Sequence, residues 1–207
     1  LSGESSPYLA LPHSWQELLS SKNKKFRYKV RKRLEFLETS GRTNLLWINN
    51  SDDLPCLLSA VKNIEEKSWK KDAGLAIFDR PTELRYHEKL LPMLVESGML
   101  LSNVLTIDGR PAAYSLACIR NGWCGQMKTS FNTDFADFSP GAIVVDETIK
   151  EAIKLGADEF DFLGDRDAYK LVWTKTVRDH STFWLFMKNR LRGRLLGTFR
   201  RIFDVSN

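Results

Sequence analysis

Hydrophobic and polar residues between positions 100 and 130 follow the pattern of short β-strands joined by tight turns. Apolar runs at 100–107 and 112–119 flank Asp108-Gly109, and Asn121-Gly122 leads into a third run at 123–130. Asp-Gly and Asn-Gly favour two-residue hairpin turns, because these residues tolerate the left-handed backbone that such turns require. The pattern therefore predicts a three-stranded antiparallel meander.

The segment after the meander predicts a helix followed by another strand. Ser139 is expected to cap the helix and Pro140 to take its first position, where a missing N–H is tolerated. Apolar residues then recur at helical spacing as far as Gly156, a plausible stop, and a strand is expected at 158–163. A meander, a crossover helix and a further strand predict an α+β fold with a mixed sheet.

The N-terminal part of the chain predicts the flanking helices. A short helix is expected to open at Ser14, and longer ones to span 23–39 and 79–97 and to run from Ser51 towards Trp69. A strand is expected at 43–48 and a last one at 176–187. Pro92 predicts a kink or a break in the helix over 79–97.

The basic residues are concentrated near the two ends of the sequence. The chain has 207 residues and a net charge of +5, with eight lysines and arginines in 22–33 and six more in 188–201. The basic face of the helix over 23–39 has three open interpretations: a solvated surface, an anion-contacting surface or a membrane-surface helix. We predict one domain over residues 1–187 and a basic helical tail over 188–207.

Cysteine content and hydropathy indicate the environment of the protein. The three cysteines form no C-x-x-C pair and their odd number argues against a disulfide framework, which favours a cytoplasmic location. No apolar run approaches the ~20 residues that a membrane-spanning helix needs. The histidines and cysteines lack the spacing of metal ligands, so no metal is predicted.

The helix start at Gly141 is a candidate anion site. The N-terminal N–H groups and the dipole of a helix both favour an anion, and a glycine allows a ligand close to the backbone. Residues 140–143 also contain no carboxylate, although acids are favoured in a first turn. An ordinary capped helix without a ligand is the alternative.

Three segments resemble a known family. They are SFNTDFADFSPG (130–141), FDFLGD (160–165) and AYKLVW (168–173). In this order and spacing they resemble the GNAT-like acyltransferases associated with a bacterial cellulose-biosynthesis protein, and they are more distantly similar to Fem-type aminoacyltransferases of peptidoglycan bridge synthesis. The Gln/Arg-x-x-Gly-x-Gly/Ala phosphate loop of commoner GNAT enzymes is absent, and Ser139-Pro140-Gly141 stands in its place. Family members often have a second GNAT-like half ahead of this one, which is a partner that the resemblance implies.

The resemblance implies an acyl-coenzyme A donor, acetyl-CoA or a longer acyl-CoA, which lies where two strands splay apart. A tyrosine of the family protonates the thiolate, the lysine after it neutralises a phosphate or the oxyanion, and an aspartate is a candidate general base. The catalytic residues implied in this way are Tyr169, Lys170, Asp161 and Asp165. The donor-binding residues implied are Lys128, Thr129, Ser130, Ser139, Gly141 and Ala142.

The function implied is transfer of an acyl group to an amine or hydroxyl of a small-molecule or cell-envelope, polysaccharide-related acceptor. The first alternative is a Fem-type transferase that uses aminoacyl-tRNA, which the basic ends would suit electrostatically. The second is a catalytically silent GNAT-like module that binds an anionic polymer or a membrane surface.

Overall fold

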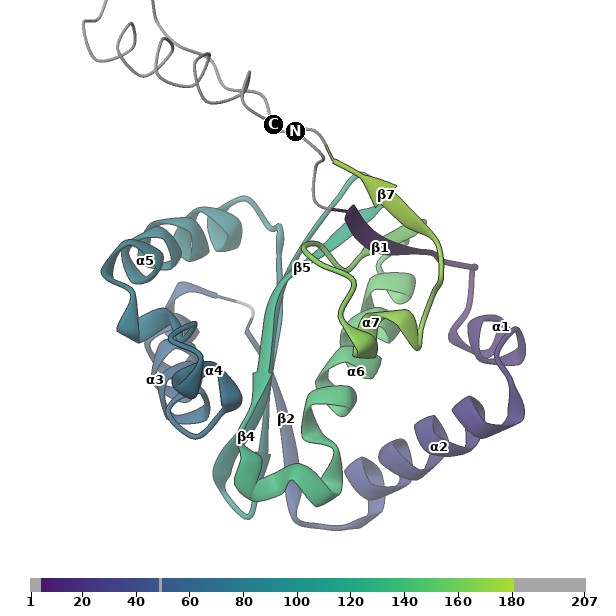
Figure 1. The fold of residues 1–207 in the computed structure, drawn as a ribbon, viewed down its shortest axis with the longest axis horizontal. Coiled ribbons are helices and arrows are strands. Elements are labelled where there is room, and N and C mark those ends of the chain that lie inside the picture. Colours follow the sequence, from purple (N-terminus) through teal and green to yellow (C-terminus); the bar gives the residue numbers. More distant parts are fainter. Residues whose placement is uncertain (1–4, 49, 181–207) are drawn as a thin grey trace, which may run out of the picture.

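A seven-stranded sheet forms the centre of the computed structural model, which describes residues 5–48 and 50–180 (Figure 1). The order of the strands across the sheet is β2-β3-β4-β5-β6-β1-β7. Only the β5–β6 pair is parallel, and the other five pairs are antiparallel. The predicted mixed α+β sheet is therefore confirmed. The strands are β1 (Ser5–Ala10), β2 (Thr43–Ile48), β3 (Leu100–Ile107), β4 (Arg110–Arg120), β5 (Trp123–Phe131), β6 (Glu159–Asp161) and β7 (Val177–Asp179).

The predicted meander corresponds to β3, β4 and β5. Asp108 and Gly109 have φ values of 50° and 72°, and Asn121 and Gly122 have values of 49° and 79°. Both residues of each turn are therefore left-handed, as a two-residue hairpin with the native strand twist requires. The two dipeptides were sufficient to locate both turns.

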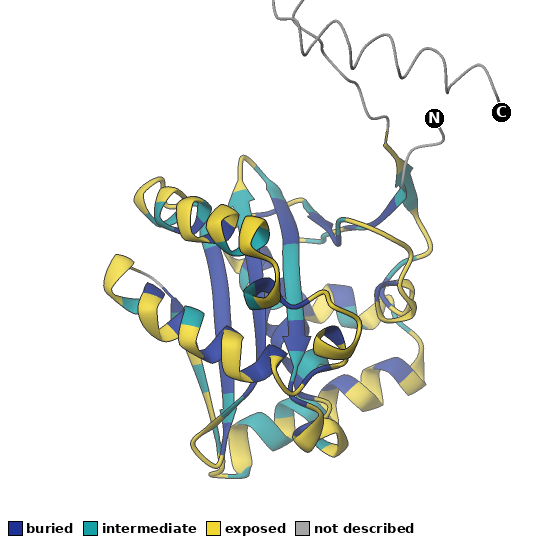
Figure 2. Cartoon of the chain, turned by 60° about the vertical axis from the view of Figure 1, so that its left-hand side comes forward, coloured by how far each residue is buried: buried dark blue, intermediate teal, exposed yellow. Residues whose placement is uncertain are grey.

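Helices cover both faces of the sheet. In Figure 1, α3, α4 and α5 lie on one face, and α1, α2, α6 and α7 lie on the other. Figure 2 shows the buried strands between these two layers, with the exposed surfaces of the helices outside. The helices are α1 (Trp15–Ser20), α2 (Lys24–Thr39), α3 (Leu54–Glu65), α4 (Trp69–Asp72), α5 (Pro81–Glu96), α6 (Pro140–Lys154) and α7 (Ala168–Leu171), with 3₁₀ turns at Ser51–Asp53, Ile77–Asp79 and Thr133–Phe138.

Two details of the predicted helices are corrected. The cap after β2 is Asn50 rather than Ser51, because the Asn50 side chain accepts hydrogen bonds from the amides of Asp52 and Asp53 at 2.9 and 3.1 Å. The predicted helix towards Trp69 is divided into α3 and α4, and α5 continues through Pro92 without a break. Pro92 therefore removes one intrahelical hydrogen bond without ending the helix.

The N-terminal strand β1 was not predicted. It lies between β6 and β7 and pairs antiparallel with both, so it extends the sheet beyond the strands that the sequence indicated. β7 agrees with the beginning of the strand expected at 176–187. The remainder of that strand and the basic tail over 188–207 fall outside the described residues.

Strands β5 and β6 separate after a short contact. Trp123–Gly125 pairs with Glu159–Asp161, and no pair joins the two strands beyond Gly125. β6 is only three residues long, and the chain then turns through Leu163 and Gly164, whose φ values are 47° and 60°. Residues 126–131 of β5 are therefore paired with β4 alone, and we call their other side the free edge of β5.

Candidate functional site

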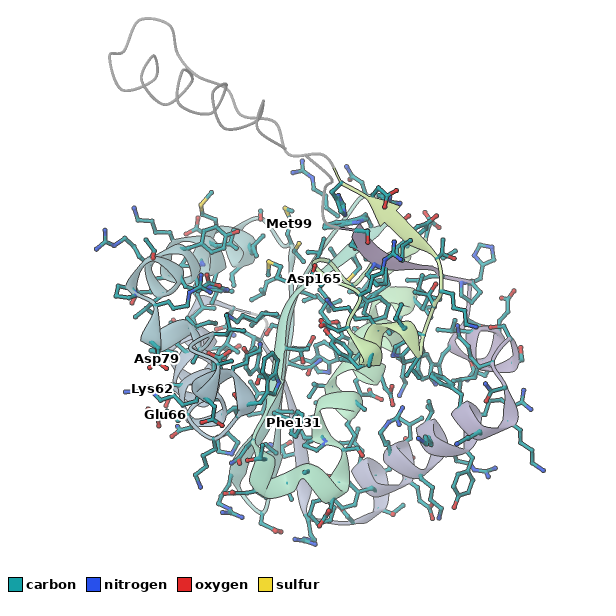
Figure 3. The ribbon with its side chains drawn as sticks, viewed as in Figure 1. Lys62, Glu66, Asp79, Met99, Phe131 and Asp165 are labelled. Carbon is teal, nitrogen blue, oxygen red and sulfur yellow. The ribbon has the colours of Figure 1, made fainter. Side chains whose placement is uncertain are left out.

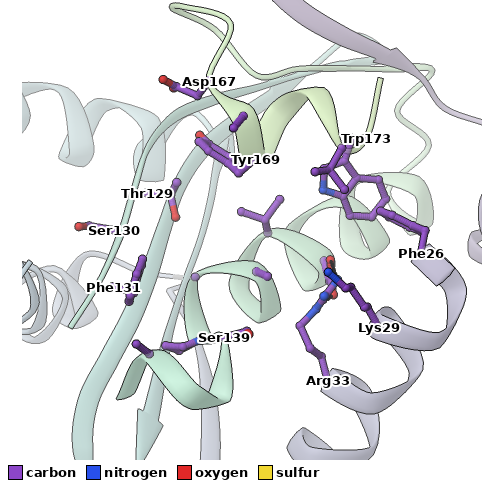
Figure 4. Close-up of a pocket in the computed structure, with 18 of the residues that line it drawn as sticks. Phe26, Lys29, Arg33, Thr129, Ser130, Phe131, Ser139, Asp167, Tyr169 and Trp173 are labelled. Carbon is purple, nitrogen blue, oxygen red and sulfur yellow. Dashed lines mark hydrogen bonds and ion pairs between the residues drawn. The ribbon is translucent and has the colours of Figure 1, made fainter. Parts of the chain in front are cut away.

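A pocket of about 550 Å³ opens beside the free edge of β5 (Figure 4). Its walls come from β5, from the start of α6, from α2 and from the segment around α7. Trp69 of α4, on the opposite face of the sheet, also lines it, so the pocket reaches both sides of β5. The residues from β5 and α6 that line it include Thr129, Ser130, Phe131, Ser139, Pro140, Gly141, Ala142 and Val145. It therefore collects five of the six predicted donor-binding residues.

The backbone of β5 is available to a ligand along this pocket. The Asn132 amide donates to the Ala112 carbonyl of β4 at 2.8 Å. Because hydrogen-bonded and outward-facing residues alternate along an antiparallel strand, the peptide groups of Thr129 and Phe131 face away from β4. The side chains alternate too, so Ser130 lies on the other face of the sheet from Thr129 and Phe131.

Ser139 begins α6 in a way that the sequence did not predict. Its φ and ψ are 53° and 46°, in the left-handed region, and its side chain makes no capping hydrogen bond. The prediction of a side-chain cap is therefore wrong. Ser139 also ends the preceding 3₁₀ turn, and its amide donates to the Ala136 carbonyl at 2.9 Å. The left-handed residue reverses the chain between two helical segments.

The start of α6 offers fewer amides than expected. The amides of Ala142 and Ile143 both donate to the Ser139 carbonyl, at 3.0 and 3.2 Å. Ala142 lines the pocket, but its amide is engaged in this contact and is not one of the free N–H groups that an anion site at the helix start would use. A Cβ on Gly141 would lie 3.0 Å from Cδ1 of Phe131, so Gly141 is also required for close packing.

Helix α2 supplies the side of the pocket opposite β5. Phe26, Lys29 and Arg33 from this helix line the pocket. Arg33 donates from Nε and Nη2 to the two carboxylate oxygens of Asp146, at 2.6 and 3.0 Å. Burial raises the pKa of Asp146 to about 6, and the hydrogen bonds and charge of Arg33 oppose that rise. This pair joins α2 to α6 beneath the pocket.

The charged residues that line the pocket leave one positive charge uncompensated. Arg33 pairs with Asp146, and Asp167 accepts from Lys170 Nζ at 2.9 Å. Lys29 has an exposed side chain and forms no ion pair with any residue that the structure describes. The rest of the lining is largely apolar and aromatic. The pocket therefore suits a ligand with an apolar arm and an anionic group.

Residues in and after α7 form the wall nearest the start of α2. The Trp173 ring packs edge-on against Phe26 at a centroid distance of 4.8 Å and lies 6.1 Å from Trp15. Tyr169 is 41% exposed and lines the pocket. Burial around its hydroxyl raises the pKa of Tyr169, and the Asp167 carboxylate adds to the shift. Its phenol is therefore protonated at neutral pH and can donate a hydrogen bond.

Lys170 and Asp165 lie outside the pocket. Lys170 is 5% exposed, and its Nζ donates to the carbonyls of Leu163 and Asp165 at 2.7 and 2.9 Å. These bonds hold the loop before α7, and the ammonium does not line the ligand space. Figure 3 shows Asp165 in that exposed loop, apart from Phe131 at the pocket wall. Neither side chain is placed for the role that the resemblance implied.

Asp161 and Lys128 are likewise engaged elsewhere. Asp161 is 2% exposed, accepts from the Leu163 amide at 2.8 Å and lies 3.5 Å from Nη1 of Arg178. Lys128 Nζ lies 3.2 Å from the Glu83 carboxylate, on the α5 side of the sheet. Neither lines the pocket. Of the predicted residues, the pocket brings together Tyr169, Thr129, Ser130, Ser139, Gly141 and Ala142.

Several pocket residues were missed by sequence reasoning. The basic helix was recognised, but nothing in its pattern showed that Lys29 and Arg33 turn towards α6. Asp146 lies beyond the first turn of its helix, and nothing around it in the sequence indicates Arg33 as its partner. Phe26 is buried against Trp173, which lies far away in the sequence. The local pattern of the sequence indicates neither of these pairings.

The parallel strands β5 and β6 separate after Gly125, and a pocket opens beside β5 and the start of α6. The model of the acetyltransferase (GNAT) domain family matches residues 24–171, and the chain belongs to this family. This match assigns the chain to the GNAT family as a whole and not to the cellulose-biosynthesis-associated group within it. No curated protein sequence matched the chain.

Solved structures share the fold at low sequence identity. A crystal structure of FemX aligns with a TM-score of 0.64 and 16% identity, over 86% of this chain and 60% of that one. The C-terminal domain of a putative lysylphosphatidylglycerol synthetase from Agrobacterium fabrum gives a TM-score of 0.55 and 11% identity, over 86% and 59%. An aminoglycoside acetyltransferase from an uncultured soil metagenomic sample, in complex with sisomicin, gives 0.51 and 13%, over 73% of this chain and 100% of that one. The chain thus spans about three fifths of the first two structures.

The described residues contain neither a candidate membrane-spanning helix nor a candidate metal cluster. Within 5–48 and 50–180, no helix has the length and apolar character needed to cross a bilayer. The same residues contain no group of three or more histidine, cysteine or acidic side chains arranged to hold a metal ion.

Proposed function

We propose that this protein transfers an acyl group from acyl-CoA, such as acetyl-CoA, to an amine or hydroxyl acceptor. The observation that carries the proposal is the pocket along the free edge of β5, in a chain that belongs to the GNAT family. The Thr129 amide and the outward peptide group of Phe131 would hydrogen-bond the amides of the pantetheine arm, because Lys70 already donates to the Thr129 carbonyl. The apolar walls would cover that arm, and Lys29 with the Gly141 amide would face the phosphates.

Tyr169 is the residue that we place beside the thioester. Acyl transfer needs a donor for the oxyanion and for the sulfur of the leaving thiolate, and preorganised donors act strongly in a dry site. The raised pKa keeps the Tyr169 phenol protonated, so it donates a hydrogen bond throughout the reaction. The acceptor is proposed to be a small molecule or a cell-envelope saccharide, in the bacterial cytoplasm.

Calorimetric titration with coenzyme A, acetyl-CoA and longer acyl-CoA, with charged tRNA for comparison, tests the donor directly. Saturable binding of acyl-CoA is expected. The Fem-type alternative is supported by the fold shared with FemX and by the basic, exposed surface of α2, and it requires tight binding of charged tRNA instead. Binding of neither donor, together with binding of an anionic polymer or vesicle, would favour the silent module.

Ala142→Asp is expected to weaken coenzyme A binding at least tenfold, or by ~1.4 kcal/mol. The new carboxylate would repel the donor phosphates, yet an acid in a first turn stabilises a helix by about 0.3–1 kcal/mol. The affinity for coenzyme A should therefore fall, while the stability of the protein should rise slightly. Ala142 is a sharper test than Gly141, where any side chain would collide with Phe131. Ala142→Asn is the uncharged control, and equal affinities for the two variants would contradict the donor site.

Tyr169→Phe is expected to lower kcat by about 10²-fold with little change in donor affinity. The substitution removes one hydroxyl and retains the ring, which packs edge-on near Phe162 at 6.5 Å. Thiol release from acetyl-CoA, with glucosamine as a primary-amine probe, measures the rate, and calorimetry measures the affinity. Unchanged turnover with chemistry shown to be rate-limiting would make Tyr169 a structural residue.

A further inference from the structure

A buried polar cluster lies on the face of the sheet opposite α6, directly behind the free edge of β5. Glu65 of α3 is 1% exposed, and its carboxylate accepts from the Tyr114 hydroxyl and from the Ile77 amide, each at 2.5 Å. Lys70 of α4 is 8% exposed, with Nζ 3.7 Å from the Glu65 carboxylate. Buried ionic groups are expensive to desolvate, and apolar residues of similar volume are often at least as stable. Packing alone does not account for a lysine here.

The Lys70 ammonium reaches the pocket wall. Its Nζ donates to the Thr129 carbonyl at 2.6 Å, and that carbonyl belongs to the free edge of β5. Thr129 lines the pocket, as do Trp69, the residue before Lys70, and Ser130, the residue after Thr129. The Ser130 hydroxyl is buried without a hydrogen-bond partner among the described residues. Lys70 itself does not line the pocket, but a donor arm bound to this edge would meet its Nζ within one hydrogen bond of the Thr129 peptide.

The surroundings of Lys70 lower its pKa. The pKa of Lys70 is lowered to about 8, chiefly by burial and also by Lys128, while the Glu65 and Glu83 carboxylates oppose this lowering. The charged and titratable groups that face it are Glu65 from α3, Glu83 from α5, Tyr114 from β4 and Lys128 from β5. An amine with a pKa near the working pH can both accept and return a proton.

We propose that Lys70 is the proton shuttle of the transfer reaction, placed at the free edge of β5 beside the pocket. This role rests on the proposed acyl-CoA function. Neutral Lys70 takes a proton from the attacking amine as its nitrogen forms a bond to the thioester carbon. The carbon–sulfur bond then breaks, and the Lys70 ammonium gives that proton to the thiolate. The products are an amide and free coenzyme A, and Lys70 is again neutral.

The proton transfer to sulfur favours Lys70 over Tyr169. A thiol has an ordinary pKa of about 8.5, close to the value of about 8 for Lys70. The pKa of Tyr169 is raised above the ordinary phenol value, so its proton would move uphill to a thiolate. In this assignment Tyr169 donates a hydrogen bond, and Lys70 transfers the proton.

Lys70→Met is expected to lower kcat for thiol release from acetyl-CoA with glucosamine by about 10²-fold, while the Kd for acetyl-CoA stays within twofold. The wild-type rate should show an inflection near pH 8 that the variant lacks. Lys70→Arg should not restore the rate, because arginine does not release its proton. Lys71→Met, on the same helix but exposed and paired with Asp79, is the matched control and should retain the wild-type profile. A Lys70→Met enzyme with normal kcat and an unchanged pH profile would overturn the proposal.

A second measurement keeps the proposal testable if glucosamine is a poor acceptor or if Lys70→Met unfolds. In protein labelled with ¹³C-lysine, the Lys70 side-chain signal is assigned by its loss in Lys70→Arg and titrated with coenzyme A or desulfo-CoA bound. A nearby thiolate favours the ammonium, so the pKa of Lys70 should be higher with coenzyme A. Identical titrations in the two complexes would exclude Lys70 from the reaction centre and leave the donor site intact. Binding of neither ligand would instead reject the proposed function.

Discussion

Replacing Arg33 with methionine is expected to lower the free energy of unfolding by about 3 kcal/mol at pH 8 and by clearly less at pH 5. The substitution keeps much of the apolar stem and removes the charge, leaving the Asp146 carboxylate, 1% exposed, without its bidentate partner. An uncompensated buried charge is among the most destabilising changes that a single substitution makes.

The pH dependence follows from the direction of the Asp146 pKa. Burial already raises this pKa to about 6 in the folded wild-type protein, above the ordinary value of about 3.9 in an unfolded chain. The titration of Asp146 therefore favours folding most below pH ~3.9, and this contribution is lost as the pH rises through 6. Without Arg33 the pKa of Asp146 in the folded protein rises further. In the variant Asp146 is therefore protonated and uncharged at pH 5, where little stability is lost. At pH 8 its carboxylate is charged without a partner, and the loss of stability is large.

Urea denaturation at the two pH values measures the effect. Arg31→Met, on the exposed side of the same helix, is the matched control and should change stability by less than about 0.5 kcal/mol. Adding Asp146→Asn to Arg33→Met should recover most of the loss at pH 8, because an amide carries no charge. An equal loss at both pH values would show that Arg33 stabilises the protein through packing rather than through its charge.

Lys170→Met is expected to destabilise the protein by about 2 kcal/mol, since it removes the buried ammonium that donates to the Leu163 and Asp165 carbonyls. Lys170 Nζ binds the Leu163 and Asp165 carbonyls and the Asp167 carboxylate, and so joins the loop after β6 to α7. Loosening that loop would displace Tyr169 and the pocket wall. Lys175→Met, at an exposed lysine beyond α7, is the control.

Donor affinities distinguish this structural role from a phosphate contact. If Lys170 only supports the wall, Lys170→Met weakens the binding of coenzyme A and of phosphate-free pantetheine by the same factor. If the ammonium neutralises a phosphate, the loss is confined to coenzyme A. We expect the first result, because the Lys170 side chain is buried and its donors point to loop carbonyls. A loss confined to coenzyme A would restore the functional role that the family resemblance implied.

The parts of the fold that could be predicted are those with local signals. The turns at Asp108-Gly109 and Asn121-Gly122 were correctly located because a two-residue hairpin needs left-handed residues at fixed positions. The helix over 140–154 was predicted from its apolar spacing and its leading proline. β1 was missed because six residues near the N-terminus carry no strand signal until β6 and β7 lie on either side of them.

The sequence by itself determined the class of fold, the ends of the crossover helix and six of the residues that line the pocket. Family motifs brought Thr129, Gly141 and Tyr169 into one hypothesis, and they do line one cavity. The same motifs also selected Lys170 and Asp161, whose side chains hold the backbone of a loop instead. A motif records which residue types recur, and it does not record which way each side chain points.

Only the tertiary structure decided where the charges of the site lie. Lys29 and Arg33 come from a helix more than 100 positions before the α6 residues that they face, and Arg33 meets Asp146 across that distance. Lys70 reaches the Thr129 carbonyl from the opposite face of the sheet. Sequence periodicity specifies which side of an element is buried. The partner that each buried charge meets depends on how separate elements pack, and that is fixed only when the whole chain folds.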